Sequence, residues 1–301
     1  MGTITNEIER QEVKGPAHLL RAIRRAPLYL ALILLAAIDI FPLFWIGVSS
    51  FKTQGEIFRY PPTFLPKDFT LGNYQEALAL LPPGQQPLSE IPMGLQNSVV
   101  IATISTVFIL IFGSLAGYAF ARIRFPGRKV IFIALLCLRM LPGIVLVVPL
   151  FLVATQTRTF DTKFFMILVY TAFNLPLAIW LLTIFFQEIP AELEDAALVD
   201  GCDRWTALFR IYIPLSRPAL ATVAILSFMS CWNEFLFAVI LTNSVAAKTT
   251  PVTLASMQAA FQTRWAIMTA GAVLVSVPAI ILVIIAQQHI VKGLTMGAVK
   301  G

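Results

Sequence analysis

Six long runs that carry almost no charge constrain the fold of this chain more than any other feature. They cover residues 26–50, 98–120, 130–154, 164–186, 219–241 and 265–286. Each run holds 22 to 25 residues. An α-helix of about 20 apolar residues crosses the ~30 Å hydrocarbon core of a bilayer. The sequence therefore predicts an all-α protein with six transmembrane helices.

The composition indicates the same class of protein. Of the 301 residues, 58% are hydrophobic and 13% are charged, and the mean hydropathy is +0.81. Soluble domains carry about 25% charged residues. The net charge of +6 comes from basic residues scattered over many loops, so we expect no nucleic-acid partner and membrane lipid as the surroundings.

The distribution of lysine and arginine predicts the orientation. Cytoplasmic loops of membrane proteins carry the excess of these residues. Fourteen lie in residues 1–25, 121–129, 187–218 and 290–301, and seven lie in the segments between the other span ends. Both termini are therefore predicted to be cytoplasmic. The predicted regions are a tail 1–25, a first span 26–50, an outer segment 51–92, a core 93–289 that contains the loop 188–218, and a tail 290–301.

Two polar segments outside the spans have their own character. Residues 1–25 are either an interfacial amphipathic helix or a disordered tail, and the sequence favours neither. Residues 51–92 contain seven prolines, so this segment is too irregular to lie in lipid, where every backbone polar group needs an internal partner. A short helix is expected there from about Leu71 to Leu81.

The segment 188–218 is the longest polar interval in the second half of the chain. It holds six of the sixteen acidic residues. Pro190 suits the first turn of a helix, and Asp203 can cap a second helix from about Arg204 to Tyr212. Asp200-Gly201 is a turn signal, and we expect a positive φ at Gly201. The segment is predicted to be a helix–turn–helix, although a solvated loop remains an alternative.

The residues Glu194-Asp-Ala-Ala-Leu-Val-Asp-Gly201, followed by Phe209, Ile213-Pro214 and Pro218, resemble the EAA coupling loop of ABC importer permeases. In that family the loop docks into a cleft on a cytoplasmic ATPase subunit. The resemblance implies an ATPase-coupling role for these residues: Glu194, Asp195, Ala196, Ala197, Asp200 and Gly201.

Three further stretches resemble the second permease of the maltose-type sugar importers. They are Tyr118–Gly127, Trp232–Phe235 and Gly293–Gly301. The resemblance implies a type I ABC importer permease fold in the bacterial inner membrane and a sugar substrate. It also implies three kinds of partner: a second permease subunit, two ATPase subunits, and an extracytoplasmic binding protein that docks on the outer loops 51–92 and 242–264.

We expect neither a cofactor nor a catalytic site in this chain. It contains no GxxxxGK[ST] phosphate-binding loop, so ATP is expected to be bound by the partner ATPase subunits. Its three cysteines and two histidines are far apart in sequence, which argues against a metal site or a catalytic nucleophile. A polyamine or amino-acid importer permease is the main alternative function, and a secondary transporter is a more distant one.

The candidates for a substrate pathway are polar residues within the predicted spans: Arg139, Asn174, Ser230, Asn233 and Glu234. Amides and carboxylates can bind sugar hydroxyls, but they can equally bond neighbouring helices. Arg139 lies near the middle of the third predicted span, and three readings remain open. It pairs with Asp39, or the span begins later, or its guanidinium lines the pathway for an anionic sugar.

Overall fold

The computed structural model describes residues 16–80, 89–258 and 264–298. Within these ranges every regular element is a helix. Four continuous helices are long and apolar enough to cross a membrane. They are α1 (Pro16–Ser49), α4 (Ile91–Arg122), α7 (Lys163–Glu188) and α14 (Trp265–Ala298). They correspond to the first, second, fourth and sixth predicted spans.

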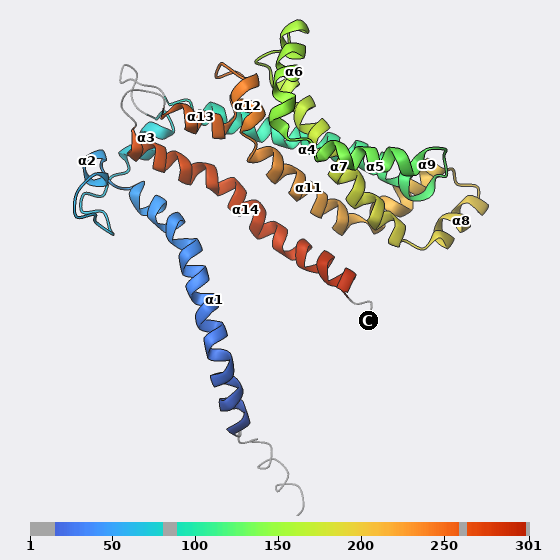
Figure 1. The fold of residues 1–301 in the computed structure, drawn as a ribbon, viewed down its shortest axis with the longest axis horizontal. Coiled ribbons are helices and arrows are strands. Elements are labelled where there is room, and N and C mark those ends of the chain that lie inside the picture. Colours follow the sequence, from blue (N-terminus) through green and yellow to red (C-terminus); the bar gives the residue numbers. More distant parts are fainter. Residues whose placement is uncertain (1–15, 81–88, 259–263, 299–301) are drawn as a thin grey trace, which may run out of the picture.

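The bundle is built around α4, α7 and α11 (Arg217–Trp232), which pack side by side (Figure 1). Small residues allow the close approach of α4 and α7. A Cβ atom on Gly117 would lie 3.0 Å from Cβ of Leu182, and one on Gly113 would lie 3.2 Å from Cβ of Ala178. Close helix contact through small residues is the usual packing mode in membranes, where van der Waals contact replaces the hydrophobic drive.

The third predicted span, 130–154, is wrong as a single straight helix. It consists of α5 (Arg128–Arg139) and α6 (Gly143–Gln156), which meet at an angle of 93°. Pro142 causes the break, because proline lacks an N–H and disfavours helical geometry at the residue before it. Arg139 consequently is the last residue of α5, directly before the break.

The fifth predicted span, 219–241, is also interrupted. Helix α11 ends at Trp232, and the short α12 (Leu236–Leu241) follows after three residues. The carboxylate of Glu234 accepts hydrogen bonds from the backbone N–H groups of Phe237 (2.7 Å) and Ala238 (3.2 Å). A side chain that caps the new helix start stabilises this break. Before α11, the helical segment from Arg204 to Leu215 meets α11 at an angle of 80°.

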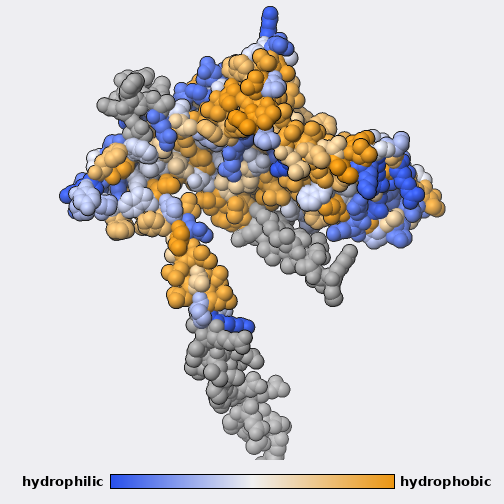
Figure 2. Space-filling view, viewed as in Figure 1, coloured by the Kyte–Doolittle hydropathy of each residue, from blue (hydrophilic) through white to orange (hydrophobic). Residues whose placement is uncertain are grey.

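The polar segments lie at opposite ends of the long axis (Figure 1). One end carries α2 (Gln54–Ile57), α3 (Gly72–Ala77) and α13 (Thr250–Ser256). The other carries α8 (Ala191–Val199) and α9 (Arg204–Ala207), followed by the π-turn η1 (Leu208–Tyr212) and α10 (Ile213–Leu215). Figure 2 shows hydrophilic residues gathered at both ends and apolar surface between them.

Helix α1 stands apart from the bundle and approaches it only near its C-terminal end (Figure 1). The described side chains from Pro27 to Phe44 are all exposed. Asp39 lies among them, far from the short contact of α1 with α14. The first ten residues of α1 belong to the predicted tail and continue the span without a break. Residues 1–15 of that tail lie outside the described residues.

Candidate functional site

The coupling segment folds as the expected pair of helices. Gly201 has a φ of +88° between them, as the turn signal predicted. Thr206 donates a backbone N–H to Oδ1 of Asp203 at 2.8 Å and so caps α9. Pro190 directly precedes α8 instead of occupying its first turn. The second helical stretch runs through Tyr212 as predicted, but its last turn is a π-turn.

Glu194 differs from the other residues of the coupling motif because it faces inward. It is 6% exposed. Its Oε1 accepts a hydrogen bond from the Tyr118 hydroxyl at 2.6 Å, and its Oε2 accepts one from the Tyr212 hydroxyl at 2.7 Å. Two hydroxyl donors satisfy a carboxylate that burial would otherwise penalise. Glu194 therefore fastens α8 to α4 and to η1.

Arg122 completes this cluster. Its Nε lies 3.8 Å from Oε2 of Glu194, and its guanidinium carbon lies 5.2 Å from the centre of the Tyr212 ring. One terminal nitrogen also donates to the carbonyl oxygens of Phe186 and Ile189, at the end of α7. The cluster of Tyr118, Arg122, Glu194 and Tyr212, called the coupling joint below, thus links α4, α7, α8 and η1.

The remaining motif residues lie on the outer surface of α8 and its turn. Asp195, Ala196, Asp200 and Gly201 are exposed, and Ala197 is half-buried. Val199, between them, is 87% exposed. The small side chains of Ala196 and Ala197 leave the backbone of α8 accessible. The apolar side chain of Val199 points away from the rest of the chain. This face is available for a partner.

A second site is a cavity of about 270 Å³ at the two helix breaks. It brings together four of the five pathway candidates, from α5, α7 and α11 with its following turn: Arg139, Asn174, Ser230 and Glu234. Asn233 does not line it. That side chain is exposed and donates back to the Met229 carbonyl oxygen at 3.0 Å. The two helix breaks, which the sequence did not predict, border this cavity and bring Arg139 and Glu234 into it.

The charges in this cavity differ in how well they are satisfied. Glu234 accepts a hydrogen bond from the Tyr170 hydroxyl at 2.8 Å, besides the two backbone N–H groups of α12. Arg139 donates one hydrogen bond, to the Phe173 carbonyl oxygen at 3.2 Å. A guanidinium has five N–H donors. Among the described residues Arg139 forms no ion pair, so the proposed pairing with Asp39 is wrong.

Asn174 and Tyr170 tie helices together within the cavity wall. Asn174 is buried and donates to the Tyr170 carbonyl oxygen at 2.8 Å and towards Sγ of Cys231 at 3.6 Å. The aromatic wall of Tyr170, Phe173 and Phe237 was not predicted, because aromatic side chains do not stand out within an apolar run. Tyr170 could have been found as a tyrosine within a span, where its hydroxyl needs a partner.

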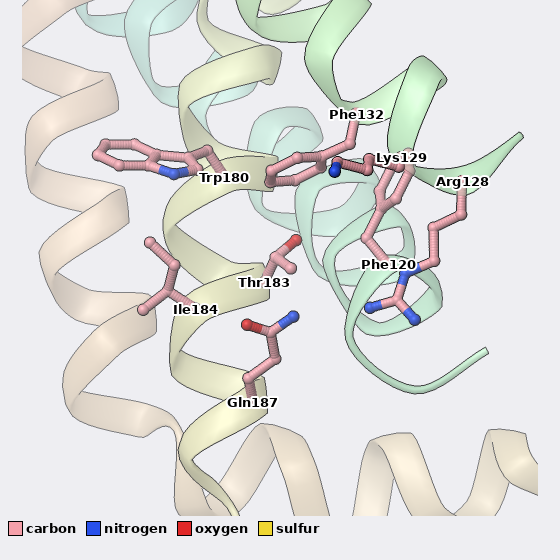
Figure 3. Close-up of a pocket in the computed structure, with 8 residues that line it drawn as sticks. All are labelled: Phe120, Arg128, Lys129, Phe132, Trp180, Thr183, Ile184 and Gln187. Atoms are coloured by element: carbon pink, nitrogen blue, oxygen red, sulfur yellow. The ribbon is translucent and has the colours of Figure 1, made fainter. Parts of the chain in front are cut away.

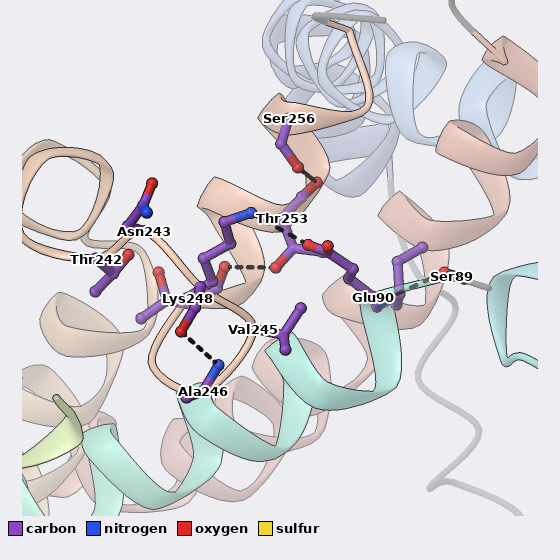
Figure 4. Close-up of polar contacts among 12 residues, drawn as sticks. Ser89, Glu90, Thr242, Asn243, Val245, Ala246, Lys248, Thr253 and Ser256 are labelled. Atoms are coloured by element: carbon purple, nitrogen blue, oxygen red, sulfur yellow. Dashed lines mark hydrogen bonds and ion pairs between the residues drawn. The ribbon is translucent and has the colours of Figure 1, made fainter. Parts of the chain in front are cut away.

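At the opposite end from α8, the loop 242–250 is tied to the start of α4 (Figure 4). The Lys248 ammonium lies 3.3 Å from Oε2 of Glu90. Asn97 donates to the carbonyl oxygens of Val245 and Lys248, both at 2.9 Å. Ser98 accepts the backbone N–H of Thr250 at 2.8 Å. These bonds give the loop 242–250 a fixed shape.

The segment that follows α1 is also ordered by buried polar groups. Lys52 is 2% exposed, lies over the Trp45 ring at 4.6 Å and donates to the Thr63 carbonyl oxygen. The Glu56 carboxylate accepts the backbone N–H of Lys67 at 2.8 Å. That bond, with the Thr63 hydroxyl, lowers the pKa of Glu56. The segments 51–80 and 242–250 therefore both have a fixed shape at the end of the molecule away from α8 (Figure 1).

A family model decides the class of this protein. Residues 88–296 match the model described as the binding-protein-dependent transport system inner membrane component. The chain belongs to that family. It is therefore a multi-pass permease subunit of the inner membrane, and the match covers both the coupling joint and the cavity at the helix breaks.

Similar permeases extend the comparison. The sulfoquinovosyl glycerol transport system permease protein SmoH of Agrobacterium fabrum is 36% identical, over 91% of this chain and 93% of that protein. The trehalose transport system permease protein SugB of Mycobacterium tuberculosis is 44% identical, over 68% and 76%. A bacterial ABC transporter involved in the import of the acidic polysaccharide alginate has the same fold. Its chain matches with a TM-score of 0.72 at 24% identity, over 91% of this chain and 98% of that one.

Proposed function

We propose that this permease forms half of the translocation pathway of an ATP-driven, binding-protein-dependent sugar importer. The names of SmoH and SugB support a sugar or sugar derivative as substrate. The observation that carries the coupling role is Glu194, buried and held by two tyrosine hydroxyls, with the rest of the coupling motif left exposed. A second permease and two ATPase subunits complete the transporter.

In this proposal the exposed face of α8 sits in a cleft of a cytoplasmic ATPase subunit. Binding of ATP shifts the permease between its two conformations only if these conformations bind the ATPase with different affinity. The coupling joint passes that difference from α8 to α4 and to the end of α7. The same helices lead to the cavity at the helix breaks, so movement at α8 changes access to Arg139, Tyr170 and Glu234.

The outer surfaces support the docking of an extracytoplasmic binding protein. The loop 242–250 and the segment 51–80 are held in shape by Asn97, Lys52 and Glu56, and both lie at the end away from α8 (Figure 1). With α8 inside, both termini face the cytoplasm, as the positive-inside rule predicts.

The substrate class has a direct test. The purified complex in proteoliposomes is given binding protein, ATP and one labelled solute: a neutral disaccharide, an anionic sugar, a polyamine or an amino acid. ATP-dependent uptake of a sugar alone supports the proposal. Uptake of a polyamine or amino acid, with no sugar transported, would establish the alternative importer class.

A second candidate specifies an anionic sugar. Arg139 offers four N–H donors beyond its single bond to Phe173, while Glu234 in the same cavity already accepts three hydrogen bonds, from Tyr170 and the start of α12. Both charged groups line the cavity, but Arg139 is the one with several hydrogen-bonding groups left for a ligand. A guanidinium binds a carboxylate, phosphate or sulfonate through two parallel hydrogen bonds.

A further inference from the structure

A cavity of about 440 Å³ lies near the coupling end of the molecule, between the last turn of α4, the start of α5 and the last turns of α7. It shares no lining residue with the cavity at the helix breaks. Figure 3 shows Phe120, Arg128, Lys129 and Phe132 on one side of α7, with Thr183 and Gln187 pointing towards them. Trp180 and Ile184 line the cavity from farther round α7. Aromatic and basic groups thus share one cavity.

The basic groups of this cavity lack an anionic partner. Among the described residues, the side chains of Arg128 and Lys129 form no ion pair and no hydrogen bond. Lys129 is exposed and Arg128 is half-buried. Unpaired cations beside an apolar surface at the end of a membrane span attract an anion at that depth.

The rest of the cavity suits a hydrocarbon chain. Trp180 is 38% and Ile184 is 39% exposed, so the α7 wall is open to the surroundings of the bundle. Phe120 and Phe132 form the opposite wall. A ligand that binds both the basic pair and the apolar walls must carry a negative group at one end and apolar chains at the other.

We propose that this cavity binds one anionic glycerophospholipid, with its phosphate between Arg128 and Lys129 and an acyl chain along Phe132, Trp180 and Ile184. The position of the basic pair at the end of three membrane helices matches the depth of lipid headgroups. Basic pockets between helices on the cytoplasmic side are the established setting for such lipids. The proposal uses the proposed function only for this orientation.

Binding here has a mechanical consequence. Phe120 lies two residues from both Tyr118 and Arg122 of the coupling joint. Thr183, on the α7 wall of the cavity, lies three residues before Phe186, whose carbonyl oxygen accepts a hydrogen bond from Arg122. A bound lipid therefore packs against α4 and α7 where the joint holds them together, and it stabilises the coupling end of the bundle.

The test uses the whole complex in nanodiscs of mixed phosphatidylglycerol and phosphatidylcholine, released for native mass spectrometry. Wild-type complex retains phosphatidylglycerol in preference to phosphatidylcholine. The double variant Arg128→Gln/Lys129→Gln retains roughly ten-fold less, because each basic residue contributes on the order of a few-fold in affinity. The control Arg158→Gln/Lys163→Gln removes the same charge from the other end of α7 and leaves retention unchanged.

A photo-cross-linker at Ile184 identifies the occupant independently. The proposal expects cross-links to lipid acyl chains in the assembled complex. Cross-links to the second permease polypeptide instead would overturn it, as would equal retention of the two lipids or unchanged retention by the double variant. Sugar uptake by the wild-type complex is measured in parallel, so that failure of the lipid site is distinguished from failure of the transport function.

Discussion

The hydroxyl of Tyr118 donates a hydrogen bond of 2.6 Å to the carboxylate of Glu194, across 76 positions of sequence. It joins the end of a membrane helix to the coupling helix. Tyr212 supplies a second hydroxyl at 2.7 Å, and Arg122 supplies the positive charge. A rigid connection of this kind is what a lever needs, because a freely hinged α8 would move without moving α4.

Removing the carboxylate should uncouple transport from ATP hydrolysis. Glu194→Ala leaves Arg122 without its ion-pair partner and both tyrosine hydroxyls without their acceptor, which we expect to cost about 3 kcal/mol or more. Tyr118→Phe removes one hydrogen bond to a charged group and should cost about 1.5–3 kcal/mol. We expect fewer sugar molecules transported per ATP in both variants, with the larger loss in Glu194→Ala. A normal ratio in Glu194→Ala would mean that the joint does not transmit movement.

The turn after α8 should depend on glycine for its backbone conformation alone. A Cβ atom on Gly201 would meet nothing within 4 Å, but its φ is +88°. Gly201→Val should therefore strain the turn by about 1–2 kcal/mol without a clash. We expect normal membrane insertion, weaker binding of the ATPase in a pull-down and lower substrate-stimulated ATP hydrolysis.

The matched control for this variant is Gly201→Asn. Asparagine tolerates positive φ better than other side chains, so its complex should bind the ATPase almost as well as wild type. Equal effects of valine and asparagine would attribute the defect to side-chain bulk at the interface and not to the turn.

The sequence predicted what depends on local chemistry and missed what depends on neighbours. The Asp200-Gly201 turn, the Asp203 cap and the continuous spans follow from glycine freedom, capping and hydrophobic length, which act within a few residues. Glu194 looked like its exposed neighbour Asp195, because only the packing of α4 and η1 against α8 turns one inward. Nothing within the motif itself distinguishes the two.

The helix breaks show the same limit. Pro142 and Pro149 both lie in the third predicted span, yet only Pro142 ends a helix, while Pro149 lies inside α6. Helices in membranes tolerate proline when neighbours satisfy the freed carbonyls, and those neighbours are not local. The four pathway candidates that line the cavity stand out in the sequence as polar exceptions in apolar runs, whereas Phe173 and Phe237 resemble the rest of the spans.

Arg139 should select substrates without supporting the fold. Its side chain is exposed and its single hydrogen bond goes to a backbone carbonyl oxygen, so Arg139→Gln should assemble normally. If the pathway takes an anionic sugar, its uptake should fall on the order of ten-fold or more, since a charge-assisted bidentate contact is lost. Arg139→Lys keeps the charge but not the planar pair of donors, and should recover part of that loss.

The control for Arg139→Gln is the uptake of a neutral sugar by the same variant complex. Equal losses for neutral and anionic sugars would assign Arg139 to pathway shape. Unchanged uptake of every sugar would remove it from the pathway.

The predicted orientation is tested by labelling single cysteines after the three native ones are replaced. Tyr60, which is 93% exposed at the outer end, should react with a membrane-impermeant maleimide added to intact cells, when it is replaced by cysteine. Val199→Cys on the coupling segment, in cells that express the permease without its ATPase partner, should react only after the cells are permeabilised. The opposite pattern would place α8 outside, where it could not meet an ATPase.

The most direct test is to identify, by cross-linking, the subunit that contacts the exposed face of α8 in the working complex. A photoreactive maleimide is attached to Val199→Cys, where the side chain is 87% exposed, and the assembled transporter is irradiated with and without ATP. We predict a cross-link to the ATPase subunit, with a yield that changes when ATP is added. Failure to capture the ATPase from this position, in a complex that still imports sugar, would contradict the coupling role of α8.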